Sequence, residues 1–420
     1  MNLKSILLDN KTTKQTIFKN TFWLMLAEGI SKGLMFFLTI LIARYLGAEG
    51  YGIFSFAFAF VALFAVLADF GLSTLTIREV AREKSLARKY IDNIATIKLI
   101  LGIITFGLIV GIIQFLEKTP EVKTLVYLAG ICVIIQSFTE FFQSIFRAFE
   151  KMQYEALSKI IYSLLLFSIA GFILWKNLGI KLLVYSYIIA AIIALIFTLI
   201  LVRKKFTKFR VEIDFEFWKK LLKESWPFTL TLIFAVIYFK IDIVMLSFMK
   251  NDTAVGLYSA AKNTLVGLGI ITFIICATVY PIFSKYYVKS KDRLYSFFKK
   301  VWGYSIAFNV ILISFLYPIT PLIIKTLYGA EFISSVSVMY IFLFTYLLTF
   351  SNTLINYLIN ASNQQRLAIK PICISLLINI FLNALLIPRY SYNGAALATL
   401  LSDLFITCFF FNIIKRKIFI

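Results

Sequence analysis

The sequence predicts an all-α protein that crosses the membrane many times. Of its 420 residues, 60% are hydrophobic and only 15% are charged, with a mean hydropathy of +0.88, whereas soluble domains carry about 25% charged residues. Apolar runs of roughly 18 residues or more recur along the whole chain, which is the length that a helix needs to cross the hydrocarbon core. Lipid cannot satisfy backbone polar groups, so these runs predict helices and argue against strands.

Twelve apolar runs divide the chain. The first follows a polar, lysine-containing segment, and it is too long to be a cleaved signal peptide. The four cysteines lie within the runs and show no CxxC spacing, so we expect neither a disulfide nor a metal site. The runs lie at 21–43, 51–72, 94–116, 123–145, 159–176, 181–202, 226–248, 255–283, 301–324, 335–358, 370–388 and 395–414.

The Lys and Arg residues are distributed unevenly between the segments that connect the runs. With the N-terminus inside, 31 of the 43 basic residues lie in inner segments and eight in outer loops. The positive-inside rule then predicts a multi-pass protein of the cell membrane with both termini in the cytoplasm. These loops also account for the net charge of +22, so we expect no nucleic-acid partner. The remaining four lysines are Lys32, Lys98, Lys240 and Lys262.

The longest inner connection, 203–225, divides the chain into two halves of six spans, 1–202 and 226–420. Within it, Ile213, Phe217, Leu221 and Leu222 repeat at helical spacing, with lysines on the other side. This pattern predicts an interfacial helix that lies on the cytoplasmic leaflet.

A short motif recurs in the two halves. Residues 52–57 read GIFSFA and residues 256–261 read GLYSAA, at an offset of 204 residues. Because each half has an even number of spans, an internal repeat predicts two six-helix bundles related by a pseudo-two-fold axis normal to the membrane. Transporters built from such repeats bind their substrate at the interface of the halves, so we expect a central cavity there.

Charged side chains inside the spans are candidates for function, because they are costly unless they face a cavity or a partner. Glu28 and Lys32 lie four residues apart in the first span and can pair on one helix face. Lysines at the interface of the halves suit an anion such as phosphate or pyrophosphate. The alternative for each charged pair is a structural salt bridge between helices. The expected cavity residues are Lys32, Lys240, Lys262, Glu28, Asp242 and Asn263.

Five further residues are weaker candidates for gating or ion coupling. Arg44 and Arg78 lie at the outer and inner ends of the first two spans, Glu140 lies in the fourth span and Asp403 near the middle of the twelfth; Asp69 is the fifth. For Glu140 and Asp403, a structural role is the stronger alternative. Lys98 differs from all of these, because it lies near the inner end of its span and its ammonium group can snorkel to the headgroups.

The sequence does not support catalysis. It contains no Walker motif and no His, and we expect no cofactor. A membrane-embedded glycan polymerase or ligase would usually need a sizeable outer loop with Arg or His. The longest outer loop lies near 325–334, which makes such an enzyme a remote alternative to a transporter.

Several stretches resemble a known family. They read ARYLGAEGYGIFSFAFAF at 43–60, ADFGLSTLTIREVAR at 68–82, KIDIVMLSFMKNDTAVGLYSAAK at 240–262 and YSYNGAALATLLSD at 390–403. On these motifs the chain resembles, over essentially its whole length, the polysaccharide biosynthesis (Wzx-like, O-antigen or repeat-unit) flippases of the multidrug/oligosaccharidyl-lipid/polysaccharide exporter superfamily. It lacks the two extra helices of the lipid II flippase branch.

The resemblance implies a V-shaped pair of six-helix bundles that moves a lipid-linked oligosaccharide to the outer leaflet by alternating access, without ATP. The implied substrate is a glycan on polyprenyl phosphate or pyrophosphate. Membrane lipids, and the glycosyltransferases and polymerase of the same pathway, are the implied partners. A drug/cation antiporter of the same superfamily is the alternative within transport. It would favour a cavity of carboxylates and aromatic rings, whereas three lysines favour an anion.

Overall fold

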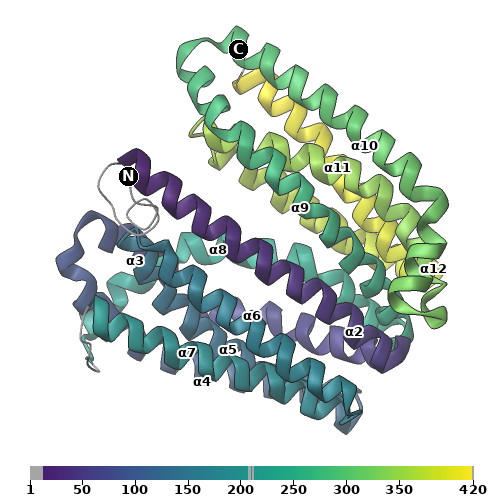
Figure 1. Cartoon of the computed structure of the whole chain (residues 1–420), viewed down its shortest axis with the longest axis horizontal. Coiled ribbons are helices and arrows are strands. Elements are labelled where there is room, and N and C mark those ends of the chain that lie inside the picture. Colours follow the sequence, from purple (N-terminus) through teal and green to yellow (C-terminus); the bar gives the residue numbers. More distant parts are fainter. Residues whose placement is uncertain (1–12, 207–209, 211, 419–420) are drawn as a thin grey trace. The chain divides into compact units, whose positions relative to one another are not determined.

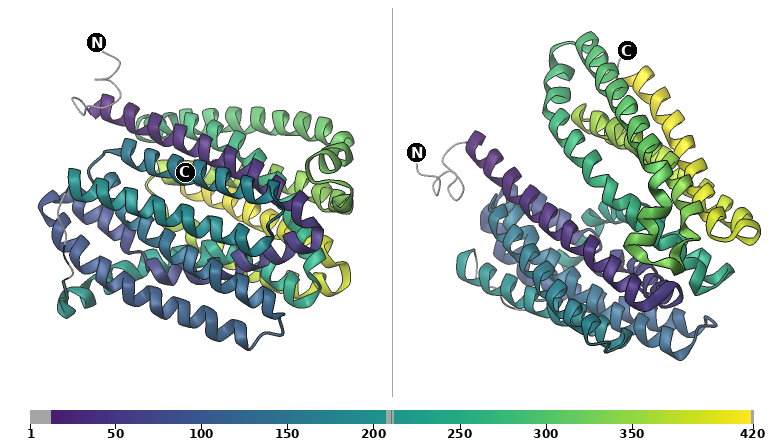
Figure 2. Two further views of the ribbon diagram at one scale, coloured as in Figure 1. Left: turned by 60° about the horizontal axis from the view of Figure 1, so that its bottom comes forward. Right: turned by 45° about the vertical axis from the view of Figure 1, so that its right-hand side comes forward.

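The computed structural model describes residues 13–206, 210 and 212–418, and this part of the chain is built from helices without strands (Figures 1 and 2). Ten of its helices are long and apolar enough to cross a membrane. The all-α, multi-pass fold class is therefore confirmed. The long helices are α2 (Thr13–Asp69), α4 (Ala87–Gln114), α5 (Pro120–Ala148), α6 (Met152–Trp175), α7 (Ile180–Lys205), α8 (Phe215–Met249), α9 (Asp252–Lys289), α10 (Lys291–Tyr328), α11 (Ser335–Ala361) and α12 (Arg366–Lys417), and the short ones are α3 (Leu72–Arg82) and the 3₁₀ turns η1 (Lys84–Leu86) and η2 (Ala330–Phe332).

Two of the long helices are interrupted where the sequence predicts an outer loop. In α2 the backbone leaves the helical region at Gly47 (φ 68°, ψ −177°), and in α12 it does so at Ser391 (φ 51°, ψ −131°). Gly47 suits this position because a residue without a Cβ adopts positive φ at little cost. Twelve spans require that both arms of α2 and both arms of α12 cross separately, so that number stays a prediction.

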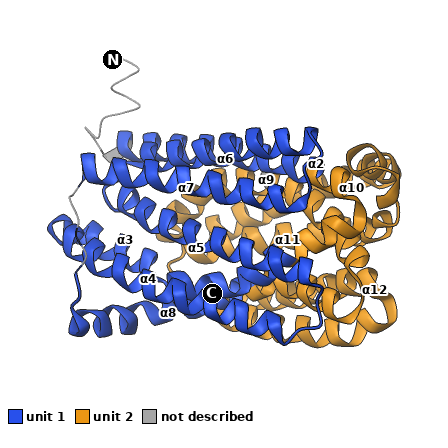
Figure 3. Ribbon diagram, turned by 90° about the horizontal axis from the view of Figure 1, so that it is seen from below, with its two compact units in different colours: residues 1–41, 57–236 blue, residues 42–56, 237–420 orange. Residues whose placement is uncertain are grey.

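The chain forms two compact units (Figure 3). Unit 1 comprises residues 1–41 and 57–236, and unit 2 comprises residues 42–56 and 237–420. The segment around the interruption of α2 thus belongs to unit 2, while the first part of α8 belongs to unit 1. The termini themselves, 1–12 and 419–420, lie outside the described residues, and their expected cytoplasmic placement stays a prediction.

Each unit has its own apolar core. In unit 1, fully buried side chains such as Ile91 of α4 and Phe141 of α5 belong to one cluster. In unit 2, Phe283 of α9 and Leu354 of α11 belong to another. Lipid is as apolar as these side chains, so the packing itself, through van der Waals contacts, holds the helices of each unit together.

The predicted interfacial helix is present but packs differently from the prediction. From Phe215 onward the 203–225 segment is helical and continues without a break into the rest of α8. The ring of Phe217 lies edge-on to Tyr90, with 5.2 Å between ring centroids, and Leu221 is buried in the core of unit 1. Phe217 and Leu221 therefore contact protein, whereas Ile213 precedes the helix and is exposed. Residues 207–209 and 211 of the segment lie outside the described part.

Two polar residues of α4 hold this segment in place. The side chain of Asp92 accepts a hydrogen bond from the backbone N–H of Arg210 (2.7 Å). The side-chain oxygen of Asn93 accepts bonds from the indole N–H of Trp218 (2.9 Å) and the backbone N–H of Asp214 (3.2 Å). The connection that precedes α8 is thus attached to unit 1.

Candidate functional site

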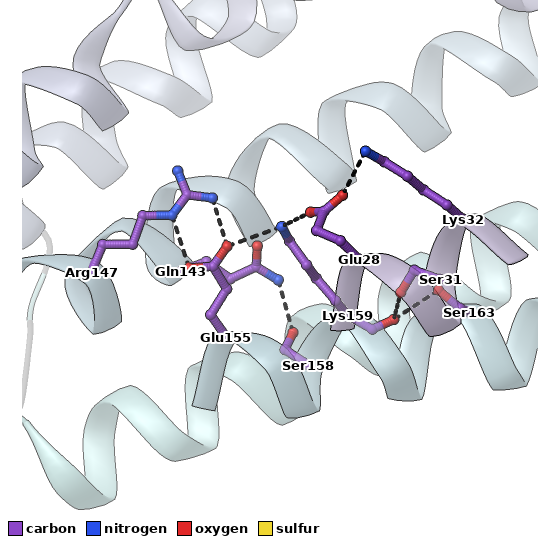
Figure 4. Close-up of polar contacts among 9 residues, drawn as sticks. All are labelled: Glu28, Ser31, Lys32, Gln143, Arg147, Glu155, Ser158, Lys159 and Ser163. Carbon is purple, nitrogen blue, oxygen red and sulfur yellow. Dashed lines mark hydrogen bonds and ion pairs between the residues drawn. The ribbon is translucent and has the colours of Figure 1, made fainter. Parts of the chain in front are cut away.

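A chain of five charged side chains, alternating in sign, joins three helices of unit 1 (Figure 4). Arg147 of α5 forms two bonds to Glu155 of α6, at 2.6 and 2.8 Å. The ammonium of Lys159, one turn further along α6, lies 3.1 Å from Glu155 and 2.8 Å from Glu28 of α2. The second oxygen of Glu28 lies 3.2 Å from the ammonium of Lys32. We call these five residues the charge chain.

The charge chain encloses a buried carboxylate and ends at two partly exposed cations, Arg147 (39%) and Lys32 (53%). The side chain of Glu155 is fully buried, that of Glu28 is 33% exposed and that of Lys32 is 53% exposed. Three cations face two carboxylates, which leaves one positive charge in excess. Because Lys32 is the most exposed member, its ammonium is the member best placed to meet an anion from outside the unit.

The sequence predicted only part of the charge chain. The expected pairing of Glu28 with Lys32 is confirmed. Arg147, Glu155 and Lys159 were missed, because they were counted with the inner connection between two runs, whereas α5 continues to Ala148 and α6 begins at Met152. A signal was present, since Glu155 and Lys159 stand four residues apart with the acid first, the favourable order for a pair on a helix.

Lys98 does not snorkel, contrary to expectation. Its side chain is fully buried, and its ammonium donates to the carboxylate of Asp69 and to the hydroxyl of Ser137, both at 2.7 Å. Asp69 also accepts a bond from the hydroxyl of Ser73. A buried ammonium needs a counter-charge, and Asp69 at the end of α2 supplies it, so this gating candidate is part of an internal ion pair.

Glu140 and Arg78 occupy different surroundings in unit 1. Glu140 of α5 is exposed and forms no ion pair or hydrogen bond with the described residues, although the charges of Lys98 and Lys159 lie near enough to act on it. The guanidinium of Arg78 lies 3.1 Å from Glu224 and 5.6 Å from the ring centre of Phe228. Arg78 thus joins α3 to the first turns of α8.

In unit 2, Asp242 and Lys262 form an ion pair between α8 and α9. The ammonium of Lys262 lies 2.7 Å from the carboxylate of Asp242, which is buried and also accepts a bond from the hydroxyl of Tyr258. Lys262 donates a further bond to the carbonyl of Phe239 (2.9 Å). Lys240, two residues from Asp242, forms no ion pair with any residue that the structure describes. The carboxylate of Asp242 therefore neutralises Lys262 and not Lys240.

The remaining candidates of unit 2 are held by neutral groups. Buried Asp403 of α12 accepts hydrogen bonds from the hydroxyls of Tyr238 and Thr349. Arg44 donates to the carbonyl of Thr326 (2.8 Å). Asn263 makes a long contact, 3.5 Å, with the hydroxyl of Tyr328 near the end of α10.

The sequence of the chain matches a known protein family. The sequence model of the family described as polysaccharide biosynthesis protein matches residues 17–287, more than half of the chain. The chain belongs to this family. The match includes the motif stretches at 43–60, 68–82 and 240–262, so the resemblance found in the sequence is confirmed.

Proteins with similar sequences include a putative transporter and a probable flippase. The chain is 23% identical over 410 residues to a putative O-antigen transporter of Shigella dysenteriae, covering 94% of this chain and 100% of the relative. It is 24% identical over 390 residues to the probable low-salt glycan biosynthesis flippase Agl15 of Haloferax volcanii, covering 91% and 80%. An uncharacterized membrane protein of Methanocaldococcus jannaschii is 23% identical, covering 92% and 81%.

Solved structures of other proteins share the fold of this chain. The lipid II flippase MurJ in an inward closed conformation superposes with a TM-score of 0.77 at 17% identity, covering 93% of this chain and 87% of MurJ. A multidrug resistance MATE family transporter of the MOP superfamily in an inward-facing conformation gives a TM-score of 0.73 at 15% identity, covering 94% of each chain. Both are membrane transporters of helical architecture, as expected for this chain.

Proposed function

We propose that this protein flips lipid-linked oligosaccharide or polysaccharide repeat units from the cytoplasmic to the outer leaflet by alternating access. Membership of the polysaccharide biosynthesis family and full-length similarity to an O-antigen transporter and a glycan flippase support this function. No step of it requires catalysis by the chain. The expected carrier is a polyprenyl phosphate or pyrophosphate, and the site is the cell membrane with both termini in the cytoplasm.

The charge chain is the observation that connects this function to particular residues. Its most exposed cation is Lys32, whose ammonium offers point-charge bonds to phosphate oxygens. In unit 2, Lys240 forms no ion pair with the described residues, whereas Lys262 is already paired with Asp242. We therefore place Lys32 first among the anion-binding candidates, Lys240 second and Lys262 third.

The remaining parts of the expected arrangement belong to the same proposal. Glu28 and Asp242 hold the lysines, Asn263 adds a polar group, and two bundles of six spans related by a pseudo-two-fold axis enclose the cavity. The glycosyltransferases and polymerase of the pathway are proposed partners. An ion-coupled multidrug or cation antiporter is the second candidate, supported by the similarity to a MATE transporter; the excess of cations over carboxylates in the charge chain disfavours a cationic substrate.

Export of glycan in a strain that lacks its own flippase tests the proposal. Lys32→Gln should abolish surface glycan while the protein remains inserted at normal levels, because the variant removes the exposed charge and keeps the polar side chain. Lys181→Gln, on the exposed side of α7, is the matched control and should export normally. Normal export by both Lys32→Gln and Lys240→Gln would overturn this assignment of the anion site.

A further inference from the structure

The two carboxylates of the charge chain are held in different ways. Glu155 is fully buried and receives two parallel bonds from the guanidinium of Arg147 in addition to one from Lys159. Such a fork fits a carboxylate in both geometry and charge. Glu28 is 33% exposed and receives one bond from each of two lysines, Lys159 at 2.8 Å and Lys32 at 3.2 Å.

This difference makes Glu155 a permanent partner and Glu28 an exchangeable one. Separating the carboxylate of Glu155 from the guanidinium of Arg147 would break an ion pair at a fully buried carboxylate, which is costly. Lysine ammoniums sit on flexible stems and each offers three donors in rotatable directions. Lys32 and Lys159 can therefore turn from the carboxylate of Glu28 to other oxygens without disturbing the Arg147–Glu155 fork.

Phosphate oxygens are the natural competitors for these two lysines. A diphosphate diester carries two negative charges where Glu28 carries one, so it interacts more strongly with the same ammonium groups. If the diphosphate diester binds while Glu28 stays ionised, three cations face two carboxylates and two phosphate charges, which leaves one negative charge in excess. The carboxylate of Glu28 then lies close to the bound anion. One proton on Glu28 removes that excess.

We propose that Glu28 is a stand-in for the substrate's phosphate group: it occupies Lys32 and Lys159 in the empty site, and it is displaced and protonated when the lipid-linked diphosphate binds. This inference rests on the proposed function. The step is an exchange of ion pairs with uptake of one proton from solution, and no covalent bond changes. It assigns Glu28 the role of coupling substrate binding to protonation.

The charged groups around Glu28 come from three helices. Lys32 lies on α2 itself, Lys159 and Glu155 lie on α6, and Arg147 lies on α5. Arg147 and Glu155 neutralise each other through their fork. Glu140 of α5, on which Lys159 acts electrostatically, forms no ion pair with the described residues, so it is the competing candidate for the proton.

Calorimetric titration of the full-length protein in detergent micelles tests the inference. The probe is farnesyl diphosphate linked to N-acetylglucosamine, a diphosphate diester that does not titrate near neutral pH. Titration in two buffers of different ionisation enthalpy counts the protons that bind with the probe. We expect about one proton per probe for the wild type, and an affinity that falls by up to about tenfold per pH unit as the pH rises.

The variants separate Glu28 from its neighbour. Glu28→Gln should bind the probe more tightly, with no proton uptake and no pH dependence, because the neutral amide competes poorly for the lysines. Glu28→Asp provides a second variant if the amide impairs folding. Its shorter carboxylate still titrates but bridges both lysines less well, so it should keep proton uptake and bind the probe more tightly than the wild type. Glu140→Gln should behave as the wild type.

The outcomes distinguish this inference from the proposed function. Binding by the wild type without proton uptake overturns the role of Glu28 alone. Proton uptake that persists in Glu28→Gln, or that disappears in Glu140→Gln, also overturns it. A wild type that does not bind the probe overturns the proposed substrate class, and this inference with it.

Discussion

Gly52 and Gly256 meet where the second arm of α2 crosses the beginning of α9, so closely that neither has room for a side chain. A Cβ on Gly52 would lie 1.7 Å from the carbonyl oxygen of Asp252, and a Cβ on Gly256 would lie 1.8 Å from the carbonyl oxygen of Ala48. Each carbonyl belongs to the residue four positions before the other glycine. The contact is therefore reciprocal.

The same two glycines open the recurring motif, and the offset of 204 residues also relates Ala48 to Asp252. The contact keeps its pattern when the two segments exchange places, as expected close to a two-fold axis. This supports the proposed internal repeat, although it relates only these short segments of unit 2. The pseudo-two-fold relation of whole bundles stays a prediction.

Replacing Gly52 should destabilise the protein. Gly52→Ala places a methyl group against the backbone of α9, and overpacking of this kind costs roughly 1–3 kcal/mol. Thermal unfolding in detergent should show a lower midpoint. Gly107→Ala is the control, because nothing lies within 4 Å of a Cβ at that helical position; alanine there should be neutral or stabilising. Equal midpoints for the two variants would contradict the close crossing.

Arg147 should matter for stability through Glu155. Arg147→Met removes the fork from a fully buried carboxylate. Breaking a fully buried pair costs roughly 3–5 kcal/mol, and we expect the lower end or less because the Arg147 side chain is 39% exposed. Thermal unfolding of the double variant Arg147→Met/Glu155→Gln should recover most of the loss. A double variant as unstable as the single one would contradict the pairing.

Lys262 should act as a structural counter-charge as well as a candidate for anion binding. Lys262→Gln leaves Asp242, whose side chain is 2% exposed, without its cation, so the unfolding midpoint should fall. Lys32→Gln should leave the midpoint nearly unchanged, because Lys32 is half exposed. Adding Asp242→Asn to Lys262→Gln should restore stability. If the double variant also exports glycan, Lys262 is structural. If the double variant is stable but does not export glycan, the ammonium of Lys262 is itself required.

Cysteine labelling should determine the sidedness. In a background without the four native cysteines, a membrane-impermeant thiol reagent should modify Asn251→Cys from outside and should not reach Ser290→Cys. The two positions are matched, because both side chains cap the N-terminus of the helix that follows, α9 and α10 respectively. Outside labelling at Ser290→Cys would overturn the proposed topology.

The sequence by itself determined the all-α membrane class, the family and the contacts that lie within one helix. The apolar runs and the family's motifs can be read directly from the linear sequence. Because lipid offers no hydrogen-bond partners to the backbone, such runs form helices, which satisfy their backbone groups internally. The pairing of Glu28 with Lys32 followed in the same way, because the helical repeat alone places residues four apart on one face.

Only the tertiary structure decided which charges on different helices meet. Lys98 was expected at the headgroups, yet it pairs with Asp69, 29 residues away. Asp242 was expected to hold the charge of one or more cavity lysines, but only the structure shows that its ion-paired partner is Lys262 on the neighbouring helix. Lys159 was counted as a loop cation, yet it joins Glu28 to Glu155. The rotation and axial position of each helix decide such pairings, and these come from the packing of the whole unit, which local periodicity does not specify.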